Sequence, residues 1–154
     1  MEQSTLRAAF ACFPSGVTAL CALVDGAPDG MAVSAFTPVS LDPPLLAVCI
    51  QGGSKTWRRL RTAPAIGVTV LAAGHDALCR RLSAPADRFA GVPWTASPTG
   101  AVFVDGSPAR FDCVLHEELP AGDHLIALLR IHALEFSSAG APLVFHGSAF
   151  RQLA

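Results

Sequence analysis

Short apolar runs of strand length, separated by clusters of Gly, Pro, Asp and Ser, make up most of this chain. The first run differs, because its apolar positions between residues 4 and 13 recur three and four apart and predict a helix. Two further short helices are expected in the middle of the chain. The prediction has helices over residues 4–13, 55–61 and 76–82, and strands over residues 17–24, 31–36, 45–50, 66–71, 101–104, 111–119, 125–136 and 142–146.

The order of these elements indicates the fold class. Many short strands with few helices are typical of a mainly β protein whose antiparallel strands form a closed or nearly closed barrel. The composition is uniform along the 154 residues, which predicts a single domain, 1–154, long enough to bury a core. Because 51% of the residues are hydrophobic and only 15% are charged, we expect part of the surface to be buried against a second copy, in a homodimer.

Charge narrows the function classes. The net charge of −1 excludes the electrostatic footprint of a general nucleic-acid-binding protein. Residues 55–88 are nevertheless cationic, with seven Lys or Arg against two Asp, which suits a small phosphate-bearing ligand or an acidic partner. A solvated helix face is the alternative explanation for Arg58, Arg59 and Arg61.

Cysteine usage and hydropathy exclude other classes. The five cysteines are scattered and form no C-x-x-C pair, so we expect neither a disulfide framework nor a metal site, and interpret them as small apolar core residues. No apolar run approaches the ~20 residues of a membrane span. The chain also begins without a signal-peptide pattern, so a cytoplasmic protein that does not enter a membrane is expected.

Candidate chemistry concentrates in residues 30–57. A strand with small residues, from Ala32 to Ala35, would let a planar cofactor ring lie close to the backbone, although a half-buried strand explains the same pattern. After the next strand comes Gly-Gly, then Ser54 as a predicted N-cap, then Lys55 and Thr56. Such a helix start offers N–H, hydroxyl and ammonium donors to a phosphate. An ordinary capped helix is the alternative.

Several motifs follow one another in an informative order. They are FPSGVT (13–18), GMAVSAFT (30–37), SLDPPL (40–45), SKT (54–56), DRF (87–89), GDH (122–124) and PL (142–143). Over nearly its whole length the chain thereby resembles the flavin reductase-like family, the FMN-binding split barrels that serve as small components of two-component monooxygenases. The resemblance implies a mainly β, antiparallel Greek-key split barrel with a few short helices. It also implies an NAD(P)H:flavin oxidoreductase that reduces FMN or FAD and supplies it to a flavin-dependent monooxygenase.

The resemblance also implies roles for individual residues. Flavin binding is expected of Ala32, Val33, Ser34, Ala35, Cys49, Ile50, Gln51, Ser54, Lys55, Thr56, Ser83, Arg88 and Phe89. His124 is the expected catalytic residue, at the face where NADH or NADPH approaches the flavin, whereas from the sequence alone an ordinary turn histidine explains it too. Arg88 would either meet a phosphate or pair with Asp87.

Two departures from the family pattern concern the electron donor. The position five residues after His124, usually glycine, is Leu129, which is expected to narrow the nicotinamide cleft, and the chain has no tyrosine. A second hypothesis is therefore a flavin-binding carrier or oxidase of the same fold that does not oxidise NAD(P)H. A third is a haem or small-ligand module with His124 as axial ligand. No G-x-G-x-x-G pattern occurs, and the choices between FMN and FAD and between NADH and NADPH stay open.

Overall fold

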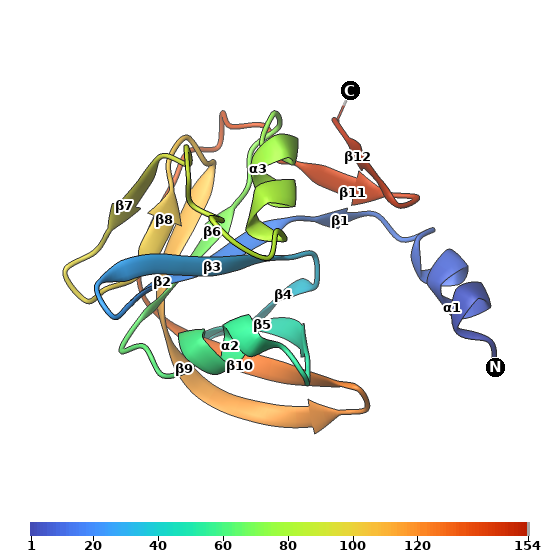
Figure 1. Cartoon of the computed structure of the whole chain (residues 1–154), viewed down its shortest axis with the longest axis horizontal. Helices are drawn as coiled ribbons and strands as arrows, with labels where there is room; N and C mark the ends of the chain where they lie inside the picture. The colour runs from blue at the N-terminus through green and yellow to red at the C-terminus, as the bar shows by residue number, and fades with distance from the viewer. Residues whose placement is uncertain (154) are drawn as a thin grey trace.

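A computed structural model describes residues 1–153 as a curled antiparallel sheet with short helices (Figure 1). The three helices of the described part are α1 (Gln3–Phe10), α2 (Lys55–Leu60) and α3 (Asp76–Leu82). The strands are β1 (Ser15–Gly16), β2 (Thr18–Val24), β3 (Ala27–Val33), β4 (Phe36–Leu41), β5 (Pro44–Gln51), β6 (Ile66–Val70), β7 (Trp94–Ala96), β8 (Val102–Val104), β9 (Ala109–Ala121), β10 (His124–Phe136), β11 (Val144–His146) and β12 (Ala149–Arg151). The expected mainly β, antiparallel fold class is confirmed.

Seven strands form the main sheet, in the order β3-β2-β6-β9-β10-β5-β4. Its two edge strands, β3 and β4, follow each other in the chain and are joined only by Ser34 and Ala35. The edges therefore meet at one end of the curled sheet, and the barrel is split between them. β5 and β6 are also consecutive, yet β9 and β10 lie between them in the sheet. The connection through α2 consequently crosses one end of the barrel.

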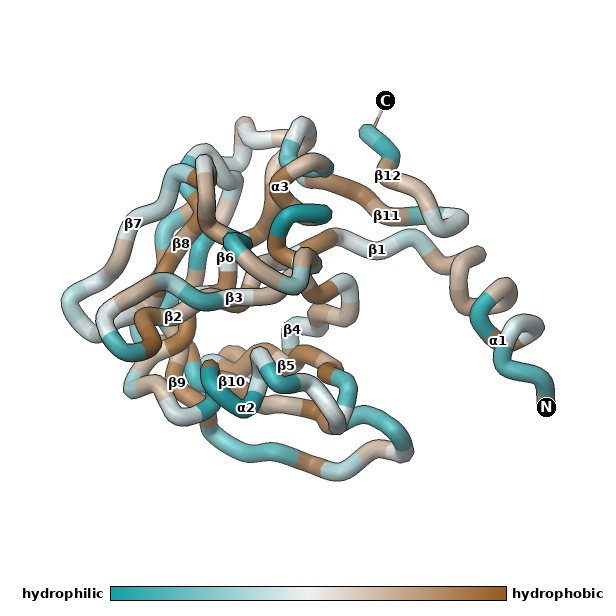
Figure 2. Tube along the Cα trace, in the orientation of Figure 1, coloured by the Kyte–Doolittle hydropathy of each residue, from teal (hydrophilic) through white to brown (hydrophobic). Residues whose placement is uncertain are grey.

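The hydrophobic core lies on both sides of β2. Leu20 and Ala22 point into the barrel, in a cluster with Leu46, Trp57 and Leu129. The alternate residues of β2 point outward into a second cluster with α3, β8 and Leu143. Figure 2 shows hydrophobic residues concentrated in these strands and polar residues on α2 and in the turns. Burial on both faces explains why β2 reads as a nearly continuous apolar run.

Two predicted boundaries were wrong. The expected strand over 31–36 is divided, because β3 begins at Ala27 and ends at Val33, and the exposed Ser34 and Ala35 carry the chain to the other edge. The turn before β3 uses only Asp25 and Gly26, with φ of 52° and 79°. A two-residue hairpin turn requires this positive φ, which Gly and Asp adopt most readily, so the following residues are free to pair with β2.

Other elements also differ from the prediction. The first helix ends at Phe10 rather than residue 13, and the prediction contained no strands corresponding to β1, β4, β7 and β12. Cys21, Cys79 and Cys113 are buried as expected, whereas Cys12 and Cys49 are exposed. Burial raises the pKa of the Cys113 thiol to about 12, so this thiol stays protonated and unreactive. None of the helices over residues 1–153 is long and apolar enough to cross a membrane.

Candidate functional site

A cavity of about 850 Å³ opens where the ends of β3 and β5 meet α2 and α3. Thirteen of the fourteen predicted site residues line this cavity, including the strand residues 32–35 and His124. The exception is Phe89, which packs against the outer core cluster instead. The full lining is Met31, Ala32, Val33, Ser34, Ala35, Cys49, Ile50, Gln51, Gly53, Ser54, Lys55, Thr56, Leu82, Ser83, Arg88 and His124.

Met31, Gly53 and Leu82 line the cavity but were not among the predicted site residues. Met31 lies two residues before Val33 on β3, so the period of two along this strand was an available signal. Leu82 ends α3 and is fully buried. Its sequence context is that of an ordinary core leucine, and no motif distinguishes it.

The N-terminus of α2 forms the polar wall of the cavity. Ser54 is the N-cap, as predicted, and its Oγ accepts a hydrogen bond of 3.1 Å from the backbone N–H of Trp57. The Ser54 hydroxyl itself lies 4.0 Å from the Met31 sulfur, a weak acceptor. The oxygen of Ser54 thus accepts a hydrogen bond from the first turn of α2, while its O–H has no strong acceptor in the described part of the chain.

Arg88 fastens the loop after α3 to this wall. Its Nε donates to the carbonyl oxygen of Ala84 at 2.6 Å, and its Nη1 donates to the carbonyl of Gly30 and to Thr56 Oγ1, both at 2.8 Å. The expected alternative, a pair with Asp87, is absent among residues 1–153, where the ion pairs involve other residues. Arg88 therefore bridges β3, α2 and its own loop.

Thr56 lies at the centre of these contacts and is only 6% exposed. Its Oγ1 accepts from Arg88 and, at 3.5 Å, from Nη2 of Arg59. Arg59 is held by Asp29 on β3, with 2.5 Å between Nε and Oδ2, and this hydrogen bond raises the pKa of the Arg59 guanidinium. The polar wall is consequently anchored to β3 at two points.

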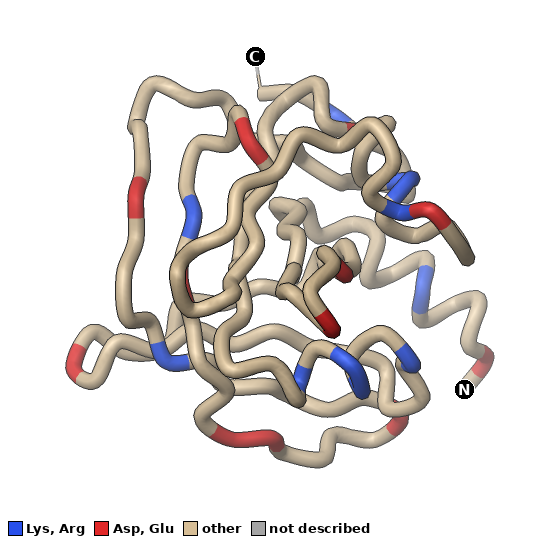
Figure 3. The backbone as a smooth tube through the Cα atoms, turned by 60° about the vertical axis from the view of Figure 1, so that its left-hand side comes forward, with Lys and Arg blue, Asp and Glu red and all other residues tan. Residues whose placement is uncertain are grey.

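The outer face of α2 is anchored to β9. Trp57 is buried, and its Nε1 donates to Glu118 at 2.9 Å. Arg61 contacts the same carboxylate at 2.5 Å, and this hydrogen bond is the main cause of the lowered pKa of Glu118. Cations gather on α2 and α3 (Figure 3). The solvated-face interpretation holds for Arg58, Arg59 and Arg61, which are all exposed, although Arg59 and Arg61 also form ion pairs there.

His124 stands at the mouth of the cavity, on the first position of β10. The β9–β10 turn has Gly122 at φ 67°, and it places His124 opposite Gln51 of β5. The Nδ1 atom of His124 lies 2.7 Å from Asp123 Oδ1, and this contact lowers the pKa of the Asp123 carboxyl. The ring is therefore held by its neighbour in the turn.

The expectation for Leu129 was wrong. Its side chain is fully buried in the inner core cluster, beside Leu46 and Leu20. The alternation along β10 explains this, because Leu125, Ala127 and Leu129 share the barrel face and His124 lies on the opposite face. Leu129 thus leaves the mouth of the cavity open.

An apolar groove of about 840 Å³ adjoins the cavity and shares Ser34 and Ala35 with it. It runs between α1, the segment from Pro14 to Thr18 and the β11–β12 hairpin. Phe10 and Phe13 on its rim are 68% and 80% exposed. The groove therefore extends the candidate site toward an uncovered apolar face.

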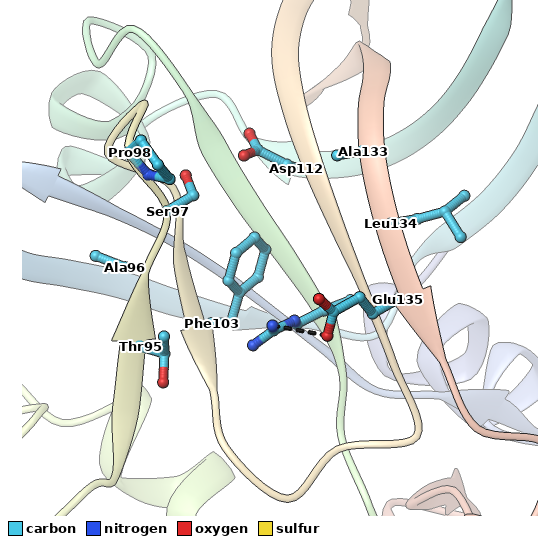
Figure 4. Close-up of a pocket in the computed structure, with 10 residues that line it drawn as sticks. Thr95, Ala96, Ser97, Pro98, Phe103, Asp112, Ala133, Leu134 and Glu135 are labelled. Carbon is cyan, nitrogen blue, oxygen red and sulfur yellow. Dashed lines mark hydrogen bonds and ion pairs between the residues drawn. The ribbon is translucent and has the colours of Figure 1, made fainter.

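A separate cleft of about 330 Å³ lies between the β7–β8 hairpin and the ends of β9 and β10 (Figure 4). Its charged side chains already have partners: Arg110 contacts Glu135 at 2.7 Å and lies over the Phe103 ring, and Asp112 accepts from Thr99. None of the predicted site residues is here. We therefore place the candidate site in the larger cavity. Among residues 1–153 no group of His, Cys, Asp and Glu is arranged to hold a metal ion.

Comparison with known proteins gives the same family from sequence and from structure. The family model described as Flavin reductase like domain matches residues 10–154. The reductase subunit HsaB of a flavin-dependent monooxygenase from Rhodococcus jostii (strain RHA1) is 36% identical over 135 residues, covering 87% of this chain and 69% of that protein.

Two solved structures extend this similarity to three dimensions. Nitrilotriacetate monooxygenase component B from Mycobacterium thermoresistibile superposes with a TM-score of 0.94 at 30% identity, over 99% of this chain and 87% of that one. The NADH:FAD oxidoreductase SgcE6 of Streptomyces globisporus C-1027, in complex with NAD and FAD fragments, has a TM-score of 0.93 at 32% identity, over 99% and 93% of the two chains.

Proposed function

This chain belongs to the flavin reductase-like domain family, and on that premise we propose that it is an NAD(P)H:flavin oxidoreductase. It reduces FMN or FAD with electrons from NADH or NADPH and supplies the reduced flavin to a flavin-dependent monooxygenase. The names of the relatives support both parts of this proposal, since one is a monooxygenase reductase subunit and another an NADH:FAD oxidoreductase.

One observation carries the proposal: a single cavity combines a wall of small residues with a wall of hydrogen-bond donors. The volume of about 850 Å³ lies within the range of cofactor sites. Ala32 and Ala35 leave room for a planar ring against the backbone, and Ser54, Lys55 and Thr56 offer hydroxyl and ammonium donors to a phosphate. The residues present therefore fit a flavin nucleotide.

A bound flavin would supply the redox chemistry, as the acceptor of the nicotinamide hydride. The chain binds and orients the two partners. We assign the pyrimidine edge of the ring to the end of β5, where Cys49, Ile50 and Gln51 line the cavity. Ser83 and Arg88 also line the cavity, and Arg88 is hydrogen-bonded there to Thr56. We assign Phe89 a supporting role outside the cavity, because it is partly buried and packs against the outer core cluster.

His124 is the proposed nicotinamide contact. It lies at the mouth of the cavity, where a second planar ring could stack on the first, and the contact with Asp123 holds its orientation. Hydride transfer depends on the distance and stacking of the two rings more than on a proton donor. His124 therefore acts by positioning the donor.

A second copy of the chain completes the proposed enzyme. The apolar groove beside α1 shares residues with the cavity, and no side chain of α1 is buried. A contiguous apolar face of this kind is typical of a protein–protein interface. In the homodimer the partner covers this groove and closes the open side of the flavin site.

The test is the initial rate of NADH and NADPH oxidation by the purified protein with FMN, FAD or riboflavin, for wild type, His124→Ala and His132→Ala. His132 is the matched control, since it is an exposed histidine farther along β10. We expect flavin-dependent oxidation, with kcat/KM for NAD(P)H about tenfold lower in His124→Ala and unchanged in His132→Ala.

Bound flavin without NAD(P)H oxidation would instead establish the carrier or oxidase hypothesis. The burial of Leu129 removes one of the two reasons for that hypothesis, since this side chain does not narrow the mouth of the cavity. A Soret band on reconstitution with haem, lost in His124→Ala, would establish the haem hypothesis.

A further inference from the structure

We propose that Arg88 is a positioning residue, which strengthens the binding of phosphorylated flavins through the hydroxyl of Thr56. The inference rests on the proposed function, because it assigns the roles of two residues within the flavin site. It predicts that the protein distinguishes FMN from riboflavin, and that this discrimination depends on the Arg88–Thr56 contact.

The donors of Arg88 are largely committed to the chain itself. Its single Nε–H donates to the Ala84 carbonyl, and the two N–H groups of Nη1 donate to the Gly30 carbonyl and to Thr56 Oγ1. These three bonds fix the plane of the guanidinium group across three segments. A side chain held in this way is suited to orient a neighbour.

Thr56 is the neighbour that this arrangement orients. A threonine hydroxyl has one donor hydrogen and two acceptor positions. Arg88 donates to the oxygen at 2.8 Å and Arg59 approaches it at 3.5 Å, so both acceptor positions face cations of the chain. The hydroxyl has no acceptor for its own hydrogen in residues 1–153, although it is only 6% exposed and lines the cavity. A buried O–H requires an acceptor, and a ligand in the cavity is placed to provide it.

The Ser54 hydroxyl, like that of Thr56, is used within the chain as an acceptor and keeps its O–H available as a donor. Its oxygen accepts from the Trp57 backbone, and its O–H meets only the weakly accepting sulfur of Met31. Two neighbouring hydroxyls therefore present donors to the cavity. An ionised phosphate offers acceptors alone and forms strong, charge-assisted hydrogen bonds. The hydroxyl that ends the side chain of riboflavin is neutral and forms weaker bonds.

The experiment compares the dissociation constants of FMN and riboflavin, measured by quenching of flavin fluorescence. The readout is the ratio of the two dissociation constants, because a general disturbance of the site raises both constants by a similar factor and leaves their ratio unchanged. The variants are Thr56→Val, Thr56→Ser, Arg88→Lys and the double variant Thr56→Val/Arg88→Lys. Arg58→Lys is the matched control, since Arg58 is exposed on the same helix and does not line the cavity.

We expect Thr56→Val to reduce the preference for FMN by about tenfold, the value of one hydrogen bond to a charged group. Arg88→Lys should cause a similar reduction despite keeping the positive charge, because an ammonium group cannot hold the three segments in one plane. In the double variant, the preference for FMN over riboflavin should fall by no more than it does in the more affected of the two single variants. Thr56→Ser, which keeps the hydroxyl, and Arg58→Lys should retain the preference.

Additive losses in the double variant would overturn the inference and make Arg88 a direct phosphate ligand. Retention of the preference in Arg88→Lys would overturn it as well, and this single variant decides the question if Thr56→Val does not fold. Equal affinity of the wild type for FMN and riboflavin would refute the phosphate role while leaving the reductase intact. Failure of the proposed function looks different, because no flavin would bind or no NAD(P)H would be oxidised.

Discussion

The α2 wall of the cavity and the groove beside α1 adjoin each other but are built in opposite ways. Around α2, buried Trp57 and Thr56 are hydrogen-bonded to Glu118 and Arg88, residues distant in sequence. Around α1, no side chain is buried, and Phe10 is 68% exposed. One of its few links to the rest of the chain is a backbone hydrogen bond from Gly147 to Ala11. Figure 1 shows α1 standing away from the barrel.

The difference indicates how the site is completed. The α2 wall is held together by contacts within one chain, so its geometry depends on the stability of the barrel. The apolar half exposes a contiguous set of apolar side chains, which is typical of a protein–protein interface, and in the proposed homodimer its geometry would depend on assembly. Changes in α2 should therefore affect folding, and changes in α1 should affect association.

Trp57→Ala should give the largest effect, on folding. The indole is 2% exposed in the inner core cluster and loses its hydrogen bond to Glu118. Truncation of a buried aromatic residue costs about 3–5 kcal/mol of the free energy of unfolding. Urea unfolding measures this, with Arg58→Ala as an exposed control that should change stability by less than about 0.5 kcal/mol. A loss below about 1 kcal/mol for Trp57→Ala would show that α2 is not integral to the core.

Phe10→Ser should affect association instead. An aromatic side chain that becomes buried in an interface typically contributes about 2 kcal/mol or more to binding, so the dissociation constant of the proposed dimer should rise by more than about tenfold. Sedimentation over a range of concentrations measures this constant. Leu134→Ser, an exposed leucine outside the groove, should leave it unchanged. A wild type that is monomeric at all concentrations would remove the dimer from the proposal.

Ser54→Ala is a smaller change in the α2 wall. It removes the N-cap bond to Trp57, which should lower the free energy of unfolding by about 1 kcal/mol. It also removes one of the two donors facing the cavity, so the affinity for FMN should fall more than the affinity for riboflavin. Ser54→Asp, which keeps the cap but adds a negative charge, should restore stability and weaken FMN binding further. Recovery of FMN affinity in Ser54→Asp would argue against a phosphate beside Ser54.

The parts of the site that depend on local signals could be predicted from the sequence. The cap at Ser54, the strand ending at Gln51 and the Gly122 turn before His124 each have a short-range cause in turn or capping chemistry. Short apolar runs bounded by turn residues likewise located most strands. Because these elements converge on one end of the barrel, their predicted residues line one cavity.

The remaining features depend on tertiary pairing. Nothing in the sequence around Arg59 or Arg61 identifies Asp29 and Glu118 as partners, since these lie on β3 and β9. The position of Leu129 followed from the alternation of β10 only once the register with the barrel was known. The family motif likewise could not show that Phe89 packs against the outer core cluster while its neighbour Arg88 lines the cavity.

The smallest expected effect concerns the pH dependence of the link between α2 and β9. Arg61, and then Trp57, lower the pKa of Glu118 below its ordinary value of 4.5. Because the folded pKa is the lower one, the stabilisation is complete above the unfolded value and is lost as the pH falls through the folded value. Arg61→Gln should therefore be less stable than wild type at neutral pH, by less than Ser54→Ala because the pair is partly exposed. Urea unfolding at neutral pH and at about pH 3 should show the difference disappearing in acid; a difference that persists there would mean that Arg61 stabilises α2 by packing and not through the Glu118 carboxylate.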